Sequence, residues 1–259
     1  SLKKFDVPIW LQCPAQQLIV ENGAVVGVKA MRNGKPLMIR AQKGVILGSG
    51  GFEHSQTLRE RYLPSPTDTR WSAANPTNTG DMLVAGQAIG AATSLLDEAW
   101  WGPNIVVEGE DRGRALFTER SMPGAILVNQ FGKRFVNESV AYTTAVQAMY
   151  EPGNLPTYLI FDSRYKRDYP FGPLLPGGMY LNWLQPRHIR KRLLKRAHTL
   201  EELAEQLKIP GSALGETVTQ FNEFARKGVD EHFHRGENSY DLIYGDVRIQ
   251  PNPCLAPLV

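Results

Sequence analysis

The stretch KGVILGSGGF, residues 43–52, decides how the first part of the chain is interpreted. Its apolar run is short and uninterrupted, and it ends in a cluster of small residues that includes Ser49, Gly50 and Gly51. This order is typical of a buried strand that meets a ligand or a tight turn. Small residues at such a point let backbone amides come close to a phosphate or a ribose. The cluster alone does not distinguish a ligand site from a turn.

The residues on either side of this stretch predict a small sheet and a helix. Before it, the apolar runs QLIV, AVVGVKAM and PLMIRA are joined by ENG and RNGK. Asn-Gly supplies the positive-φ residues of a tight hairpin turn, so residues 17–41 are expected to form a three-stranded antiparallel meander. After it, GDMLVAGQAIGAAT (80–93) predicts a helix whose small residues allow close packing. Its Asp81 is placed to cap the helix or to approach a ligand.

The second half of the chain begins with strand patterns. AILVNQFGKRFVNES (125–139) predicts a strand, a turn and another strand, and PTYLIFDSRY (156–165) predicts a further strand. Proline and glycine are dense from 170 to 186, which indicates a long ordered loop.

Two helices are predicted after this loop. Thr199 and Glu202 have the spacing of a capping box for LEELAEQL (200–207). The next helix, 209–228, ends at Gly228. The apolar residues on one face of this second helix are Leu214, Val218, Phe221 and Ala225.

Composition places the chain among globular proteins. Its 259 residues are 42% hydrophobic and 21% charged, and this length suits one large domain or two modest ones. No apolar run reaches the roughly 18 residues of a membrane span, and no signal-peptide pattern occurs in the sequence, so neither is expected. Cys13 and Cys254 lie in unrelated contexts, which favours free thiols and a cytoplasmic location, with one disulfide as the alternative. The abrupt ends of the chain favour a piece of a longer protein.

Several function classes are not supported. The net charge of +3 is too small to indicate nucleic acid, and the basic run RHIRKRLLKR lacks interleaved aromatics and precedes acidic residues, as on a solvated helix face. His232 and His234 have no acidic or cysteine partner at ligand spacing, so we expect no metal. The Gly-x-Ser-x-Gly, Walker and His-Glu-x-x-His motifs do not occur.

The pair Trp100-Trp101 in WWGP is more informative. Adjacent indoles are hard to bury together because each N–H needs a partner. The pair is therefore interpreted either as a wall of an apolar pocket or as simple packing.

Taken together, six phrases resemble flavoproteins of one family. GVILGSGGFEHS, NTGDMLVAGQAIGA, EAWWGP, ERSMPGAILVNQFGKRFVNES, FDSRY and PNPCLAPL occur here in the order found in 3-oxosteroid dehydrogenases, within the fumarate-reductase and succinate-dehydrogenase superfamily. The resemblance covers essentially the whole chain. It implies a fold class of α/β plus α+β, in which a split FAD-binding domain is followed by a cap domain.

The resemblance also implies domain boundaries. Residues 1–98 would be the remnant of the FAD-binding domain, comprising the meander, the buried strand and the helix. Residues 99–249 would form the cap, or substrate, domain, and 250–259 would begin the return to the FAD-binding domain. The Gly-x-Gly-x-x-Gly unit of the family is not in this sequence, so the chain alone is expected to hold FAD weakly or not at all and to be inactive.

Individual residues are carried over by the same resemblance. Tyr142 stands where fumarate-reducing relatives have a proton-delivering arginine, and steroid dehydrogenases are similar to this sequence in having a tyrosine there. The structural alternative for Tyr142 is an ordinary packed aromatic. The expected cofactor-binding residues are Ala15, Gln16, Ser49, Gly50, Gly51, Gly80 and Asp81, and the expected substrate-binding residues are Trp100, Trp101 and Glu119.

The activity that the resemblance implies is that of an FAD-dependent oxidoreductase acting on CH–CH bonds. Such an enzyme desaturates the A ring of a 3-oxosteroid, at Δ1 by preference or at Δ4, by losing a proton to a tyrosine-type base and a hydride to the flavin. A small apolar substrate is therefore expected as the partner, and self-association through exposed edges is a further expectation. The alternatives are a fumarate-reductase-like enoate reductase, another flavin dehydrogenase of cyclic ketones, and an isolated cap module without activity.

Overall fold

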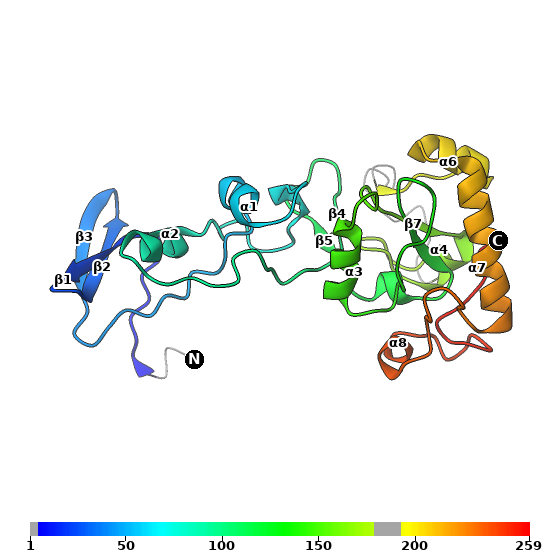
Figure 1. Cartoon of the computed structure of the whole chain (residues 1–259). Coiled ribbons are helices and arrows are strands. Elements are labelled where there is room, and N and C mark those ends of the chain that lie inside the picture. Colours follow the sequence, from blue (N-terminus) through cyan, green and yellow to red (C-terminus); the bar gives the residue numbers. More distant parts are fainter. Residues whose placement is uncertain (1–4, 179–192) are drawn as a thin grey trace. The chain divides into compact units, whose positions relative to one another are not determined.

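A computed structural model describes residues 5–178 and 193–259 of the chain. The chain divides into two compact units. Unit 1 comprises Ser1–Thr69 and Ala74–Glu98, and unit 2 comprises Arg70–Ala73 and Ala99–Val259. Strands and helices occur in both units (Figure 1), and the fold is a mixed α and β arrangement, as expected.

The three-stranded meander predicted from the two Asn-Gly turns is confirmed. Strands β1 (Ala15–Glu21), β2 (Ala24–Arg32) and β3 (Lys35–Arg40) form an antiparallel sheet in the order β1-β2-β3 (Figure 1). Asn22 and Gly23 have φ of 51° and 78°, and the second turn repeats these positive values. Positive φ at both central residues gives the turn a twist that matches the strands, so the Asn-Gly pairs fix the register locally.

The buried strand predicted for residues 43–52 is wrong. None of these residues forms a strand, and Ile46 is 98% exposed. A strand that is buried on both faces needs neighbouring strands to bond its backbone and layers to cover its side chains. The part of unit 1 that the structure describes supplies neither, because its sheet contains only β1, β2 and β3.

Unit 1 also contains two short helices. Helix α1 (Gln56–Tyr62) begins after Ser55, whose side chain accepts the backbone N–H of Leu58. Helix α2 (Asp81–Ala88) begins after Gly80 and confirms the first part of the helix predicted for 80–93. It ends earlier than predicted because Gly90 has a φ of 82°, which a helix does not accommodate. A short 3-10 turn, η2 (Thr69–Trp71), follows α1, and its last two residues belong to unit 2.

Unit 2 is built around short antiparallel strand pairs. Strand β4 (Asn104–Ile105) pairs with β5 (Arg114–Ala115), and β6 (Ala125–Val128) pairs with β7 (Tyr158–Phe161). All four residues of β6 are buried. The strands predicted at the start of 125–139 and within 156–165 are thus confirmed.

The second strand predicted within 125–139 is wrong. Only an isolated bridge, Val128 to Arg134, follows the turn. The side-chain oxygen of Asn137 accepts the backbone N–H of Ser139 at 2.8 Å. A local bond of this kind competes with strand pairing, and it turns the chain toward the next helix.

The helices of unit 2 confirm both predicted helical segments. Thr199 accepts the backbone N–H of Glu202 at 3.2 Å at the start of α6. Gly228, with a φ of 79°, ends α7. Of the loop predicted for 170–186, positions 179–186 lie outside the described residues. The helical elements are η3 (Glu119–Ser121), α3 (Tyr142–Tyr150), α4 (Ser163–Asp168), α6 (Leu200–Leu207), α7 (Gly211–Lys227) and α8 (Ser239–Ile243).

The main core of unit 2 lies between the β6-β7 pair and helices α6 and α7, which run beside each other (Figure 1). The apolar face predicted for α7 is buried here, which confirms that prediction. Burying a large aliphatic or aromatic side chain contributes about 1.5–3 kcal/mol, so this cluster fixes β6. The buried residues of the cluster include Ile126, Val128, Ile160, Leu214, Val218, Phe221, Ala225, Leu255 and Leu258.

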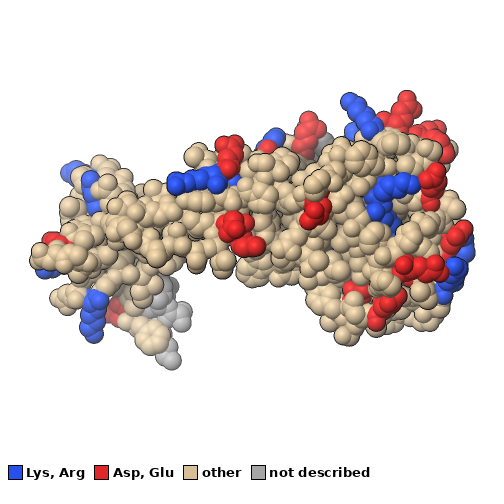
Figure 2. Space-filling view, in the orientation of Figure 1, with Lys and Arg blue, Asp and Glu red and all other residues tan. Residues whose placement is uncertain are grey.

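The surface of unit 2 carries charges of both signs. On the face that Figure 2 shows, basic and acidic side chains are interspersed around α6 and α7. Among the described residues, no helix is both long enough and apolar enough to span a bilayer.

Candidate active site

Tyr142 is the first residue of α3, and its hydroxyl is held from outside that helix. The indole Nε1–H of Trp100 donates to the Tyr142 phenol oxygen at 2.9 Å. The ring of Phe117 packs edge-on against the Tyr142 ring, with the centroids 5.1 Å apart. Tyr142 is half-buried. A partly exposed phenol with an N–H donor on its oxygen has the geometry to exchange a proton with a bound molecule.

The two tryptophans next to each other in WWGP have different environments. Trp100 is 87% exposed, whereas Trp101 is 9% exposed. The Trp101 ring meets Tyr150 edge-on at 5.6 Å between centroids. Trp101 therefore packs in unit 2, while Trp100 presents an open indole face beside the Tyr142 phenol.

Glu138, four positions before Tyr142, fixes the segment that leads into α3. Its carboxylate is fully buried and accepts two bonds of 2.8 Å from Arg134, through Nε and Nη2. It also accepts the backbone N–H of Leu127 in β6 at 3.1 Å and Nη1 of Arg235 at 3.1 Å. The entry to α3 is thereby anchored to a core strand.

The two arginines on Glu138 extend the network to other segments. Arg134 also bonds Asp230 at 2.8 and 3.2 Å. Arg235 is fully buried and donates to the carbonyls of Ser121, Met122 and Ala125. One buried cluster thus joins η3, β6, the entry to α3 and the segment before α8.

Electrostatics keep both carboxylates of this cluster ionised. Burial by itself raises the pKa of Glu138, but Arg134 and Arg235 bring the net pKa below its ordinary value. Burial also opposes ionisation of Asp230, and the bonds from Arg134 lower the net pKa of that carboxyl as well. Arg134 remains charged, because Glu138 and Asp230 raise its pKa despite burial.

Arg120, beside the expected substrate residue Glu119, is a buried arginine of a different kind. It is 2% exposed, and its two Nη groups donate to the backbone carbonyls of Glu138 and Val140. No ion pair to a carboxylate is found for it among the described residues, and burial lowers its pKa to about 10. Sequence reasoning missed Arg120, Glu138, Arg134, Arg235 and Asp230 as a connected set.

Glu119 is half-buried, and its backbone carbonyl accepts the Tyr165 hydroxyl at 2.6 Å. Its carboxylate accepts a long bond of 3.4 Å from Thr118. The carboxylate is thus only weakly held, and the backbone is fixed by Tyr165.

The expected cofactor residues lie in unit 1, and the structure brings several of them together. His54 donates its backbone N–H to the carbonyl of Asn78 at 3.0 Å, which joins the segment after the glycine cluster to the segment before α2. Gly50 has a φ of 78°, and a Cβ there would lie 2.5 Å from the Asn78 side chain. Gly80 has a φ of 80° and is closed in by Leu58 and Phe52. Glycine is therefore required at both positions by the fold itself.

The remaining cofactor residues occupy exposed or strand positions. Ser49 is exposed, and Asp81 accepts the Thr79 hydroxyl at 2.8 Å at the start of α2. Gly51 lies against the side chain of Glu53, whose Oε2 is buried without a hydrogen-bond partner in the described part of the chain.

Ala15 and Gln16 begin β1, away from the glycine cluster in sequence. Ala15 pairs with Ala30, and the register shifts between Ala15 and Gln17. Gln16 is therefore the bulged residue, with an exposed side chain. Such a bulge frees backbone groups at the end of a strand.

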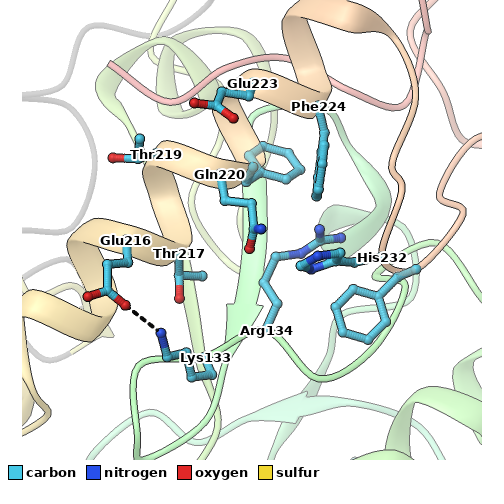
Figure 3. Close-up of a pocket in the computed structure, with 11 residues that line it drawn as sticks. Lys133, Arg134, Glu216, Thr217, Thr219, Gln220, Glu223, Phe224 and His232 are labelled. Carbon is cyan, nitrogen blue, oxygen red and sulfur yellow. Dashed lines mark hydrogen bonds and ion pairs between the residues drawn. The ribbon is translucent and has the colours of Figure 1, made fainter.

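A separate pocket of about 540 Å³ lies on α7 (Figure 3). The exposed pair Lys133–Glu216, at 2.9 Å, and Arg134 are among the residues that line it. The Arg134 guanidinium lies 4.9 Å from the ring centroid of Phe221 and 5.0 Å from that of Phe233. None of the predicted site residues lines this pocket.

The two histidines considered for metal binding are accounted for by packing and pairing. His232 stacks edge-on against Phe224 at 5.0 Å between centroids. His234 Nδ1 lies 3.1 Å from Glu237.

The chain belongs to the FAD binding domain family, whose profile matches residues 1–258. Within that family it is 41% identical over 272 residues to a 3-oxosteroid 1-dehydrogenase of Mycolicibacterium smegmatis, and the match covers 100% of this chain and 47% of that protein. A 4-oxocyclohexanecarboxylate 2-dehydrogenase of Sinomonas cyclohexanicum is 36% identical over 250 residues, covering 92% of this chain and 41% of the relative.

A solved structure agrees with these relatives. The 3-ketosteroid delta1-dehydrogenase of Sterolibacterium denitrificans, in complex with 1,4-androstadiene-3,17-dione, matches with a TM-score of 0.93 and 42% identity. The match covers 100% of this chain and 47% of that one. The resemblance to 3-oxosteroid dehydrogenases is confirmed, and the chain spans about half the length of the relatives it matches.

Proposed function

We propose that the chain is part of a flavin-dependent dehydrogenase that introduces a double bond into the A ring of 3-oxosteroids, between C1 and C2. The observation that carries this proposal is the half-buried Tyr142 phenol with the Trp100 N–H on its oxygen. It occurs in a chain that is 41% identical to a 3-oxosteroid 1-dehydrogenase. The Δ1 position is preferred over Δ4 because this relative and the Sterolibacterium enzyme are both 1-dehydrogenases.

Tyr142 is assigned as the base. A hydrogen on the carbon next to the 3-oxo group is acidic, and the Tyr142 oxygen takes that proton while the substrate also loses a hydride from the adjacent carbon. FAD, when bound, supplies the hydride acceptor. The Trp100 N–H stabilises negative charge on the Tyr142 oxygen, because it already donates to that oxygen before the charge develops.

The surroundings of Tyr142 suit a neutral apolar substrate. Trp100 is 87% exposed and Phe117 is 44% exposed, so aromatic surface is available on both sides of the phenol. Glu119 is assigned to substrate binding through its weakly held carboxylate. Trp101, which is buried against Tyr150, is assigned to the same site through its support of Trp100.

Unit 1 is assigned to FAD. Backbone at Ser49, Gly50 and Gly51, the bulge at Gln16 after Ala15, and Gly80 with Asp81 are the proposed contacts. Ser49 and the Gln16 side chain are exposed, and a Cβ at Gly48 would meet no atom within 4 Å, which favours a ligand approaching the backbone there. The unpartnered Oε2 of Glu53 offers an acceptor for a hydroxyl or N–H of a ligand. Residues 1–98, 99–249 and 250–259 are accordingly assigned to a partial FAD-binding domain, a cap domain and the return segment.

This chain by itself is proposed to hold FAD weakly and to be inactive. A purified chain with FAD added and then removed by gel filtration should be colourless. A chain that retains yellow flavin at one equivalent would overturn this part of the proposal.

The activity is tested with the FAD-loaded protein that carries this chain. Reduction of an artificial electron acceptor is followed with a 3-oxo-4-ene steroid, for wild type, Tyr142→Phe and Tyr158→Phe. Loss of the base should lower turnover by roughly a hundredfold. Tyr158 is a matched control, because its hydroxyl makes a 3.3 Å bond to the Leu207 carbonyl in the core of unit 2.

The experiment distinguishes a catalytic from a packing role of Tyr142, and a steroid from a smaller cyclic ketone as substrate. If Tyr142→Phe turns over steroid as fast as Tyr158→Phe does, Tyr142 is an ordinary packed aromatic and not the base. No steroid turnover by wild type, together with oxidation of a 4-oxocyclohexane carboxylate, would favour the second candidate, a dehydrogenase of smaller cyclic ketones. That candidate rests on the 36% identity to the Sinomonas enzyme.

A further inference from the structure

Arg120 makes its side-chain hydrogen bonds to the segment that delivers Tyr142. One Nη group donates to the carbonyl of Val140 at 2.6 Å, and the other donates to the carbonyl of Glu138. These carbonyls lie two and four positions before Tyr142. A planar guanidinium that spans two carbonyls of one segment fixes both the position and the direction of that segment.

The start of α3 depends on such support. Ala141 is its N-cap and has no side-chain oxygen, so no side-chain hydrogen bond caps the helix. The first turn of α3 is therefore positioned by what holds residues 138–140. Glu138 holds one end of that segment through its carboxylate, and Arg120 holds the backbone along it.

Stability does not account for an arginine at this position. Arg120 is 2% exposed, its Nε has no hydrogen-bond partner, and no carboxylate pairs with it among the described residues. Burying a guanidinium that has no ion pair is unfavourable relative to a packed apolar side chain of similar size. The residue is thus unfavourable as a core filler, and the bonds it makes are directed at the Tyr142 segment.

Arg120 also interacts electrostatically with residues at the end of the chain. Tyr240 of α8 and Tyr244, the residue that follows α8, oppose the effect of burial on its pKa, as does Glu138. Burial raises the pKa of Tyr240, Tyr244 and Tyr142 add to the rise, and Arg120 opposes it. The cation therefore lies within electrostatic reach of α8.

We propose that Arg120 is a positioning residue for Tyr142, which it places by holding the carbonyls of Glu138 and Val140 so that the phenol oxygen meets the Trp100 N–H. The proposal deepens the proposed function and rests on it for its catalytic meaning. The geometric part stands on the hydrogen bonds alone.

The geometric part is tested on the 259-residue chain without substrate. The sequence has 5 tryptophans, so a ¹⁵N-labelled sample gives few indole N–H resonances, and Trp100→Phe identifies that of Trp100. Tyr142→Phe marks where the Trp100 resonance lies without its acceptor. Arg120→Lys, which keeps the charge but reaches one carbonyl, and Arg120→Met are expected to move the Trp100 resonance toward that position.

A matched control distinguishes a specific effect of Arg120 on the position of Tyr142 from a general loss of stability. Leu214→Ala removes a fully buried side chain from the core cluster of α7 and destabilises the fold away from Tyr142. It should leave the Trp100 resonance in place. The proposal is overturned if the Trp100 resonance stays unchanged in a folded Arg120 variant, or if Leu214→Ala moves it equally. Failure of both Arg120 variants to fold would also contradict it, because a positioning residue is dispensable for the core.

A kinetic arm connects the geometry to the activity. In the FAD-loaded protein, Arg120→Lys should lower kcat by about tenfold or more while KM for the steroid changes little, since Arg120 acts on the base and does not contact substrate. A wild type without steroid turnover would contradict the proposed function, whereas the indole resonances would still decide the role of Arg120. A rise in KM with unchanged kcat would contradict the positioning role.

Discussion

Glu138 and Arg235 form an ion pair in which neither side chain is exposed, with Oε2 and Nη1 3.1 Å apart although 97 positions separate them in the sequence. The pair links the entry to α3 with the segment before α8. Because Arg134 binds the same carboxylate, one buried glutamate satisfies two arginines. The site around Tyr142 therefore rests on an ionic cluster.

Breaking this cluster should destabilise unit 2 strongly. Glu138→Gln leaves the buried Arg235 without its charge partner and removes one of the two carboxylates that bind Arg134, and we expect a loss of about 3–5 kcal/mol in the free energy of unfolding. Urea denaturation followed by circular dichroism measures it. Glu216→Gln, which removes an exposed pair with Lys133, is the control and should change stability by less than about 1 kcal/mol. Equal effects of the two variants would contradict the assigned role of Glu138.

The same cluster predicts acid sensitivity. The folded-state pKa values of Glu138 and Asp230 lie below their ordinary values of 4.5 and 3.8. A lowered pKa gives stability that is fully present above the ordinary value and is lost as pH falls below it. Melting temperatures measured between pH 7 and pH 3 should fall steeply below pH 4.5 in wild type. Glu138→Gln should flatten this fall, and an unchanged slope would argue against the cluster as its origin.

Gly80 should not tolerate a side chain. A Cβ at its φ of 80° would lie 2.5 Å from Leu58 Cδ1 and 2.9 Å from Phe52 Cβ. Strain at positive φ and this crowding should make Gly80→Ala less stable by about 1–3 kcal/mol. Hydrogen exchange of the α2 amides is the measurement, because it reports on unit 1 directly. Protection in α2 equal to wild type would show that the turn relaxes.

Gly215 should behave in the opposite way. It lies inside α7, and a Cβ there would meet no atom within 4 Å. Alanine is favoured over glycine in a helix by about 1 kcal/mol, so Gly215→Ala should raise the melting temperature of unit 2. A calorimetric scan measures the change. A lower melting temperature would mean that α7 packs more tightly at this position than the structure shows.

Local signals predicted the parts of the fold that local interactions determine. The Asn-Gly pairs at 22–23 and 33–34 define the meander because the turn conformation is encoded in the two residues themselves. Thr199 with Glu202 defines the start of α6 in the same way. These elements need no information from distant residues.

Predictions that depended on distant partners were less successful. The apolar run at 43–52 was expected to be a buried strand, but burial depends on neighbouring strands and not on the run itself. Helix α8 has only five residues and no periodic pattern, so the hydrophobic pattern does not predict it.

The same distinction between local and distant interactions applies to the candidate site. Tyr142 was selected from the resemblance, Trp100 was selected first from the WWGP pair, and the structure adds the bond between them. Arg120 was not selected, because its environment is formed by η3, the entry to α3 and α8, which meet only after folding. A single arginine in a sequence carries no sign of whether it will be buried.

The packing of β6 has a consequence for synthesis of the chain. Ile126 and Val128 belong to the same buried cluster as Leu255 and Leu258, and Asn222 bonds both the N–H and the carbonyl of Leu258 at 2.7 Å. Strand β6 is therefore synthesised well before the residues near 255–258 that help to cover it, and its apolar side chains stay partly exposed until those residues leave the ribosome. Unit 2 is expected to acquire its final fold after that release, and its early apolar segments are natural substrates for a chaperone in the meantime.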